Sequence, residues 1–395
     1  MKRWVFFVLL VFVPIELQAV HGQANIPQEL KFQILLNYSL EKLDYISRKN
    51  RDAREIILSH SFYATAKNVW PVKQTVLFQS FRTLMELTGS VATPLELVQD
   101  FQWRFERVHA LLDPSSQFSE IPPGAFLMGS SANPHSPNFQ LHRSAGEKEH
   151  WVYLGKDKVQ IKIQRTPVTQ LLWYLVMGNN PSYFKRKEDC VGDHLVIGEV
   201  ALCPRNPVEQ VTWNVIAQKD QDGNYQTGSF LRVLKDQFGI DARLPTEAER
   251  EKAARGEKSN PHFYDLYYVE SAGQQHAHRV ANSWLIFNSA GRTHRVGVKG
   301  WNSLGLADMC GNVSDWMDDW FDEYPDSSED YPLVNPKGPD QSPRRAIRGG
   351  SWCNFNAWTL RSAKCNLGCD GHPGGVYKHV GFRLVVEVTT DSIVK

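Results

Sequence analysis

The sequence predicts an α+β protein in which an all-α helical bundle precedes a larger domain with little regular secondary structure. Apolar residues recur with helical spacing through residues 26–113, whereas short mixed segments rich in Gly, Pro and Trp follow Ile121. A chain of 395 residues is also longer than a single core usually fills, so we expect two domains. A parallel βαβ architecture is not expected, because the sequence does not alternate strands with long crossover helices.

The helical signals begin with Leu36, Leu40 and Leu43, which fall at positions i, i+4 and i+7. A later helix is expected to open at Thr93-Pro94-Leu95-Glu96, which combines a capping hydroxyl, proline at the first helical position and glutamate three residues after the cap. Asp113-Pro114 would end that helix. We therefore expect a helical bundle domain at residues 25–113, packed through its apolar stripes.

The second domain, expected at residues 114–390, contains two helices with clear boundaries. One should open at Pro167-Val168-Thr169 and end at Gly178, and the other should be capped by Thr246 and Glu249 and end at Arg255-Gly256. The chain carries 12 tryptophans, an excess that is typical of aromatic-rich cores or recognition surfaces.

The N-terminus has the pattern of a secretory signal peptide. Lys2 and Arg3 precede the apolar run from Trp4 to Val13. Small residues between this run and residue 24 offer cleavage sites. We expect residues 1–24 to be removed, leaving an extracytoplasmic chain, periplasmic or secreted, with no membrane span. The formal charge of +1 argues against nucleic acid as a partner.

All six cysteines lie at or after residue 190, and an even number in an exported protein indicates disulfides. Cys190 and Cys203 are the easiest pair to close because they are near in sequence. The pairing of the other four, Cys310, Cys353, Cys365 and Cys369, stays open.

Eight blocks of sequence resemble, in order, the sulfatase-modifying-factor family, which contains the formylglycine-generating enzymes. They are Ile121–Gly129, Thr166–Gln170, Val176–Phe184, Asn206–Trp213, Arg243–Glu249, Gly305–Val313, Arg348–Trp352 and Gly381–Arg383. The resemblance covers roughly residues 118–388 and implies a fold related to C-type lectins, with many loops. It also suggests a core role for Trp173, Trp213, Trp316 and Trp352.

Formylglycine-generating enzymes oxidise a substrate cysteine with a cysteine pair that binds copper(I). In that group the two cysteines lie three and eight residues after the serine of the Gly-Gly-Ser motif; here those positions hold Asn354 and Thr359. Cuprous ion needs thiolate or thioether ligands, so neither copper nor formylglycine synthesis is expected. Cys353 lies one residue early, and only a rearranged copper site could use it.

Calcium is the cofactor that the resemblance favours. The family site is built from side-chain oxygens and backbone carbonyls, at positions that here hold Asp308, Gly311, Val313 and Asp315. Hard oxygen donors of this kind suit Ca²⁺. Asn282 is available for a second family site, although that site's later ligands have no clear counterpart.

The leading functional hypothesis is non-catalytic binding of a protein, peptide or small molecule through the loop after Gly349-Gly350. Aromatic rings beside amides and polar groups suit adaptable recognition, and the candidates are Asn354, Phe355, Asn356, Trp358, His372 and Tyr377. The alternative is an extracytoplasmic maturation enzyme, oxidoreductase-like, that acts on a peptide or peptide-derived substrate with the same loop. The acidic run Asp318, Asp319, Asp322, Glu323 and Asp326 is interpreted as a solvated edge.

Overall fold

The structure is a computed structural model that describes residues 94–136, 139, 143–144, 146–256, 282–355, 361–364 and 371–389. The expected signal peptide and most of the expected helical bundle lie outside these residues. Helix α6 (Pro94–Leu111) begins at the expected proline and ends just before Asp113-Pro114. None of the described helices combines the length and apolar character that crossing a membrane requires.

The chain divides into two compact units, Met1–Phe101 and Gln102–Lys395, and α6 crosses the division. Within the second unit, the ring of Phe105 stacks against Phe238 with centroids 6.4 Å apart, and His109 Nε2 lies 2.9 Å from the Phe238 carbonyl oxygen. The end of α6 thus packs against Phe238 within this unit. All that follows concerns the second unit.

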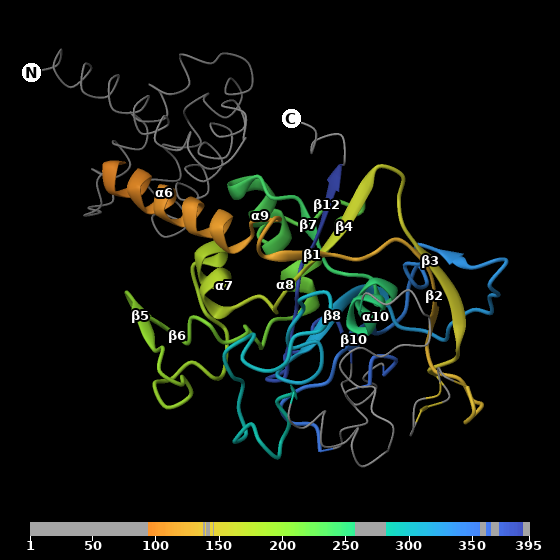
Figure 1. The fold of residues 1–395 in the computed structure, drawn as a ribbon. Helices are drawn as coiled ribbons and strands as arrows, with labels where there is room; N and C mark the ends of the chain where they lie inside the picture. Colours follow the sequence, from red (N-terminus) through yellow and green to blue (C-terminus); the bar gives the residue numbers. More distant parts are fainter. Residues whose placement is uncertain are drawn as a thin grey trace, which may run out of the picture. The chain divides into compact units, whose positions relative to one another are not determined.

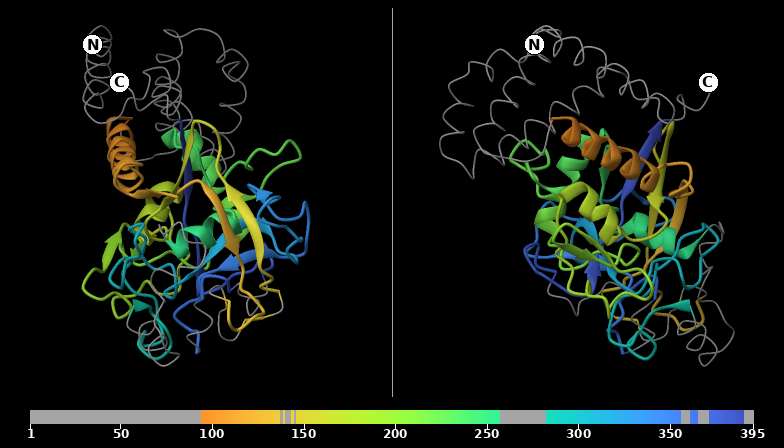
Figure 2. Two further views of the ribbon diagram at one scale, coloured as in Figure 1. Left: turned by 45° about the vertical axis from the view of Figure 1, so that its right-hand side comes forward. Right: turned by 90° about the vertical axis from the view of Figure 1, so that its left-hand side faces the viewer.

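Small sheets and short helices build the second unit, as the predicted α+β class requires (Figure 1). The largest described sheet is antiparallel, in the order β1 (Phe118–Glu120), β4 (Val159–Gln164), β12 (Val385–Thr389), β7 (Ala242–Arg243). Its two central strands are far apart in sequence and lie side by side in both views of Figure 2.

Two three-stranded sheets and a hairpin complete the strands of the described residues. One sheet runs β10 (Arg345–Arg348), β8 (Ser314–Trp320), β11 (Val380–Gly381), and the other runs β2 (Gly124–Met128), β3 (His150–Leu154), β9 (Leu333–Val334). The hairpin joins β5 (Leu195–Ile197) to β6 (Val200–Leu202). In each three-stranded sheet one pair is antiparallel and the other parallel.

The two helices expected in this unit begin and end where the sequence indicated. Thr169 Oγ1 caps α7 (Gln170–Met177) by accepting from Leu172 N, and Gly178 ends it with φ 73°. Thr246 and Glu249 form both halves of a capping box on α10 (Glu247–Arg255). The described part of this unit also contains α8 (Trp213–Ala217) and α9 (Phe230–Phe238).

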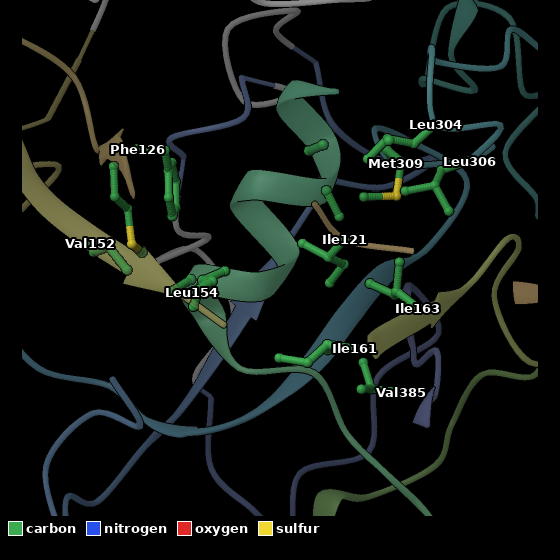
Figure 3. Packing of buried hydrophobic residues seen from close by; sticks show 14 of the residues in the cluster. Ile121, Phe126, Val152, Leu154, Ile161, Ile163, Leu304, Leu306, Met309 and Val385 are labelled. Carbon is green, nitrogen blue, oxygen red and sulfur yellow. The ribbon is translucent and has the colours of Figure 1, made fainter. Parts of the chain in front are cut away.

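Helix α10 runs through the hydrophobic core (Figure 3). Phe126, Val152 and Leu154 from the β2–β3 sheet lie on one side of the helix, and Leu304 and Leu306 lie on the other. Small alanines on α10 allow this close approach on both sides. The family tryptophans Trp173, Trp213 and Trp316 are buried, as expected, whereas Trp352 is only half-buried.

A buried ion cluster links the sheets to α10. Asp315 Oδ2 in β8 accepts hydrogen bonds from Arg250 Nε and Arg383 Nε, both at 2.8 Å. All three side chains are at most 2% exposed. Arg383 also donates to the carbonyl oxygens of Gln164 and Asp308. A second set joins Arg348 to Glu247 and Glu251, and a third joins Arg361 to Glu147.

Replacing Asp315 with alanine is expected to destabilise the fold strongly, because two buried guanidinium groups would lose their counter-charge. Loss of one partner of a buried ion pair costs about 3–5 kcal/mol in the free energy of unfolding. Urea denaturation of Asp315→Ala beside the wild type measures this cost. Asp241→Ala is the control, since the Lys235–Asp241 pair is exposed and should change stability by about 1 kcal/mol or less. Equal effects of the two substitutions would contradict the assignment.

Candidate functional site

The loop predicted to bind a ligand leaves the end of β10 at Gly349 and Gly350. Gly349 has a φ of 99°, and a Cβ there would lie 2.7 Å from Arg250 Nη2 and 3.0 Å from the Met309 carbonyl oxygen. Glycine is therefore required at this position. The buried ion cluster thus determines where the loop starts.

A tight turn follows, closed by the side chain of Asn354. The Asn354 Oδ1 atom accepts from the backbone N–H of Ser351 at 2.6 Å and from the Ser351 hydroxyl at 3.1 Å. The backbone N–H of Asn354 donates to the Ser351 carbonyl oxygen at 3.2 Å. Asn354, a predicted ligand-binding residue, therefore also holds the backbone of the loop. The turn fixes the direction in which the next residues leave.

Trp352 anchors the turn to the rest of the unit. Its backbone N–H donates to the Asn312 carbonyl at 2.9 Å, and its indole Nε1 donates to the Lys378 carbonyl at 3.1 Å. Its ring also meets Phe184 edge-on, with centroids 5.3 Å apart. This places the loop after Gly350 beside residues 371–379, which carry two other predicted binding residues.

The remaining predicted binding residues differ in exposure. Phe355, just after the turn, is 64% exposed. His372 is exposed, and its Nδ1 accepts from the Gly374 N–H. Tyr377 is half-buried, folds over Gly375 and lies 5.9 Å from the Trp316 ring. Asn356 and Trp358, together with Thr359, lie outside the described residues.

The segment 183–184, not singled out from the sequence, adds to this surface. Tyr183 is 40% exposed, and the Lys378 ammonium lies 3.5 Å from the centroid of its ring. Such a cation–π contact holds both side chains at the surface. We call the surface made by Tyr183, Phe184, 351–355 and 371–379 the aromatic face.

Glu209 lies buried behind the aromatic face and was not identified from the sequence. Its Oε1 accepts from Phe184 N at 3.0 Å, while Oε2 is buried with no partner among the described residues. Burial raises the pKa of this carboxyl from 4.5 to about 7, although backbone N–H groups and Lys185 oppose the shift. The acid therefore changes charge near neutral pH directly beneath Phe184.

Cys353 is a half-buried thiol whose Sγ lies 3.3 Å from the Ser351 hydroxyl oxygen. No hydrogen bond joins it to a histidine or carboxylate of the described residues, so this part of the chain does not assemble a thiol with a general base. Cys310 is buried in the core. Cys365 and Cys369 lie outside the described residues, so their pairing stays open.

Cys190 and Cys203 form the expected disulfide, with Cα atoms 5.2 Å apart. It closes the segment that carries the β5–β6 hairpin. Asn282, expected in a second calcium site, lies against Gly300, so close that a Cβ on Gly300 would collide with the Asn282 Oδ1 atom.

The four residues expected to bind calcium lie next to the buried ion cluster. Asp308 Oδ2 accepts from Gly297 N at 2.7 Å. Asp315 Oδ1 is buried and accepts no hydrogen bond among the described residues. Asp308 and Gly311 both have positive φ, 51° and 88°, so the chain turns tightly around this point. An oxygen left without a donor is what a cation site needs, and the two carboxylates and nearby carbonyls fit Ca²⁺.

Two features limit how strongly calcium could bind there. The Arg250 and Arg383 guanidinium groups already balance Asp315. No group of three or more His, Cys, Asp or Glu side chains in the described ranges is arranged to hold a metal. Both features would lower the affinity of these residues for a cation.

Residues 109–388, well over half of the chain, match the sulfatase-modifying factor enzyme 1-like domain. The chain belongs to this family. It is 29% identical over 153 residues to the formylglycine-generating enzyme of Mus musculus, covering 37% of this chain and 39% of that enzyme. It is 28% identical over 204 residues to chaperone protein LppX of Paenibacillus barcinonensis, covering 48% of this chain and 68% of that protein.

The formylglycine-generating enzyme of Streptomyces coelicolor is 30% identical over 162 residues, 40% of this chain and 46% of that enzyme. The chain thus spans less than half the length of these two enzymes. Among solved structures, Treponema denticola variable protein 1 aligns with a TM-score of 0.46 and 25% identity, covering 67% of this chain and 94% of that chain. Membership of the sulfatase-modifying factor family confirms the resemblance found in the sequence.

Glu209→Gln is expected to remove a pH dependence of stability. The native carboxyl keeps its proton to higher pH than the unfolded one, so the native state binds more protons between pH 4.5 and about 7. Wild-type stability should therefore fall as pH rises through this window, by about 2–3 kcal/mol between pH 5 and pH 8. Chemical denaturation at pH 5 and pH 8 measures the difference. The exposed Glu329→Gln is the control, and an unchanged slope in Glu209→Gln would refute the role of Glu209.

Proposed function

We propose that this member of the sulfatase-modifying factor family is exported and binds a protein, peptide or small-molecule ligand through its aromatic face without changing it chemically. The observation that carries the proposal is the turn at Ser351–Asn354, held by Trp352, which leaves Phe355 64% exposed. Export is inferred from the N-terminal sequence, where basic residues precede an apolar run.

A rigid loop with an exposed ring suits binding for an energetic reason. Association costs free energy when flexible side chains and loops become ordered, and a loop fixed beforehand avoids much of that cost. Aromatic rings supply large contact areas with few rotatable bonds, and neighbouring amides and histidines supply hydrogen bonds. The aromatic face offers Tyr183 and Phe355 for contact and His372 for polar recognition.

The alternative function is an extracytoplasmic maturation enzyme, oxidoreductase-like and related to formylglycine-generating enzymes, that acts on a peptide or peptide-derived substrate. The Cys353 thiol beside the Ser351 hydroxyl favours it. The two positions at which the family pattern expects cysteines hold Asn354 and Thr359, which argues against it. If purified protein with copper converted a Cys-x-Pro-x-Arg peptide to the aldehyde, and Cys353→Ser abolished this, the enzyme would replace the binding proposal.

Peptides selected from a random display library on the immobilised full chain are expected to bind at the aromatic face. Truncating a central aromatic contact costs about 2 kcal/mol, so Phe355→Ala should raise the Kd of such a peptide roughly thirtyfold. Isothermal calorimetry on the wild type and the variant measures this. Tyr331→Ala is the matched control, because Tyr331 is 82% exposed and outside the aromatic face. Peptides that bind Phe355→Ala as tightly as the wild type would place the binding surface elsewhere.

We further propose that the Asp308–Asp315 segment binds calcium and stabilises the base of the loop, because Gly311 N donates to the Gly349 carbonyl. Calcium at about ten times its Kd should stabilise the native state by about 1.4 kcal/mol. Thermal melts with calcium and with a chelator test this in the wild type and in Asp308→Asn, which should lose the gain. The exposed Asp322→Asn should keep it. A melt that calcium does not shift would exclude the site.

A further inference from the structure

A cavity of about 370 Å³ lies away from the aromatic face and shares no lining residue with it. The end of β8 with the segment that follows it, the first turn of α10, and residues 333–339 form most of its wall. A volume of this size accommodates a side chain or a small organic molecule. No sequence pattern indicates this cavity, because its walls come from segments far apart in the chain.

Asp319 forms the acidic floor of this cavity. Its side chain is 3% exposed, so the interpretation of residues 318–326 as a solvated edge is wrong for Asp319, which the fold turns inward at the end of β8. Asp322 and Glu323 are exposed, as expected. Asp319 Oδ2 accepts from the Glu247 backbone N–H at 3.0 Å. Its Oδ1 accepts no hydrogen bond from any residue within the described ranges. The side chain lines the cavity.

The other buried acid in the floor, Glu247, is already paired with a cation. Glu247 Oε1 accepts from Arg348 Nε at 2.7 Å and from the Tyr324 hydroxyl at 2.8 Å. His150 stacks against Tyr324, and burial lowers its pKa, so it adds no full positive charge at neutral pH. Among the described residues no ion pair joins Asp319 to a cation, and the nearby Arg345, whose Cζ lies 3.4 Å from the centroid of the Trp320 ring, interacts with it only at longer range. Burial and the Glu247 charge raise the pKa of Asp319 well above the ordinary value, because the charged form of this acid lacks a paired cation.

The rim adds further negative charge. Asp322 and Glu323 line the cavity and are exposed, against a single lysine, Lys337. The walls are aromatic or apolar: Trp320, Tyr324, Leu333, Pro336 and Pro339. An apolar cavity with an unpaired acid at its floor favours a cation that carries an apolar body. The cation replaces the proton that burial keeps on Asp319 and pairs with the carboxylate, while rings and prolines cover the rest.

We propose that this cavity binds an organic cation, a primary ammonium or guanidinium on an apolar chain, through Asp319. A metal ion is a poorer occupant, because no cluster of three or more ligating side chains occurs among the described residues. The cation can come from a free amine or from a lysine or arginine side chain of a partner. The proposal does not depend on the function proposed for the aromatic face.

Isothermal calorimetry on the full chain with two probes tests the proposal: cadaverine, a free diamine, and a short peptide with one lysine and blocked ends. We expect at least one of them to bind, and 1-pentanol, which lacks the charge, not to bind. Asp319→Asn should weaken the binding about ten- to hundredfold, because it loses a charge-assisted hydrogen bond. The asparagine oxygen can still accept from Glu247 N, so the variant should fold, which its thermal melt checks.

Two controls make the outcome decisive. Asp241→Asn, an exposed acid outside the cavity, should leave the affinity unchanged, and Leu333→Phe, which adds bulk to the wall, should weaken it without a change of charge. Binding of cadaverine alone identifies a small-molecule site, and binding of the peptide alone identifies a partner's side chain. Failure of both probes to bind, or equal affinity in Asp319→Asn, would overturn the proposal.

Discussion

The hydrogen-bonded ion cluster of Asp315 with Arg250 and Arg383 is the interaction on which the rest of the structure depends. Regular strands in this fold are short, so ladders of backbone hydrogen bonds alone join few distant segments. The guanidinium groups do this instead: Arg250 reaches from α10 and Arg383 from the segment before β12 to the one oxygen of Asp315 in β8. Buried ions gain little net stability over apolar packing, but once buried they tolerate only one arrangement of partners. The cluster therefore specifies the geometry more than it adds to the free energy of unfolding.

Arg348 extends the same constraint to both surfaces of interest. It bonds Glu247 and Tyr324 at the floor of the cavity and the carbonyl of Ser362 on the other side, and it directly precedes Gly349. Gly349 in turn lies so close to Arg250 that no side chain fits. The aromatic face and the cavity are thus built from different residues but on two neighbouring sets of buried charges. The side chains of either surface can therefore change without a change in the buried charged residues beneath it.

Much of the fold and part of the site could be predicted from the sequence. Helix ends were predictable because capping is local: Thr246 and Glu249 act within one turn, and Gly178 ends its helix by its own conformation. The Cys190–Cys203 disulfide was predictable from sequence proximity. The roles of Glu209 and Asp319 were not, because burial depends on which distant segments cover a residue. Asp319 reads as one acid in an exposed run, and only the packing of residues 336–339 against it closes the cavity. The helical bundle and the signal peptide stay predictions.

The turn at Ser351–Asn354 explains in physical terms how this scaffold can lose copper ligation without losing its loop. At the first of the two positions where formylglycine-generating enzymes use cysteine, this chain has Asn354, whose amide oxygen accepts from both the N–H and the hydroxyl of Ser351. A thiol is a weak acceptor and would close this turn poorly, whereas an amide is a poor ligand for cuprous ion. One side chain at this position can therefore ligate cuprous ion or close the turn by hydrogen bonds, but it cannot do both well. With the amide in place, the loop is held by its own hydrogen bonds and by Trp352, and the Phe355 ring stays exposed for the ligand that we propose.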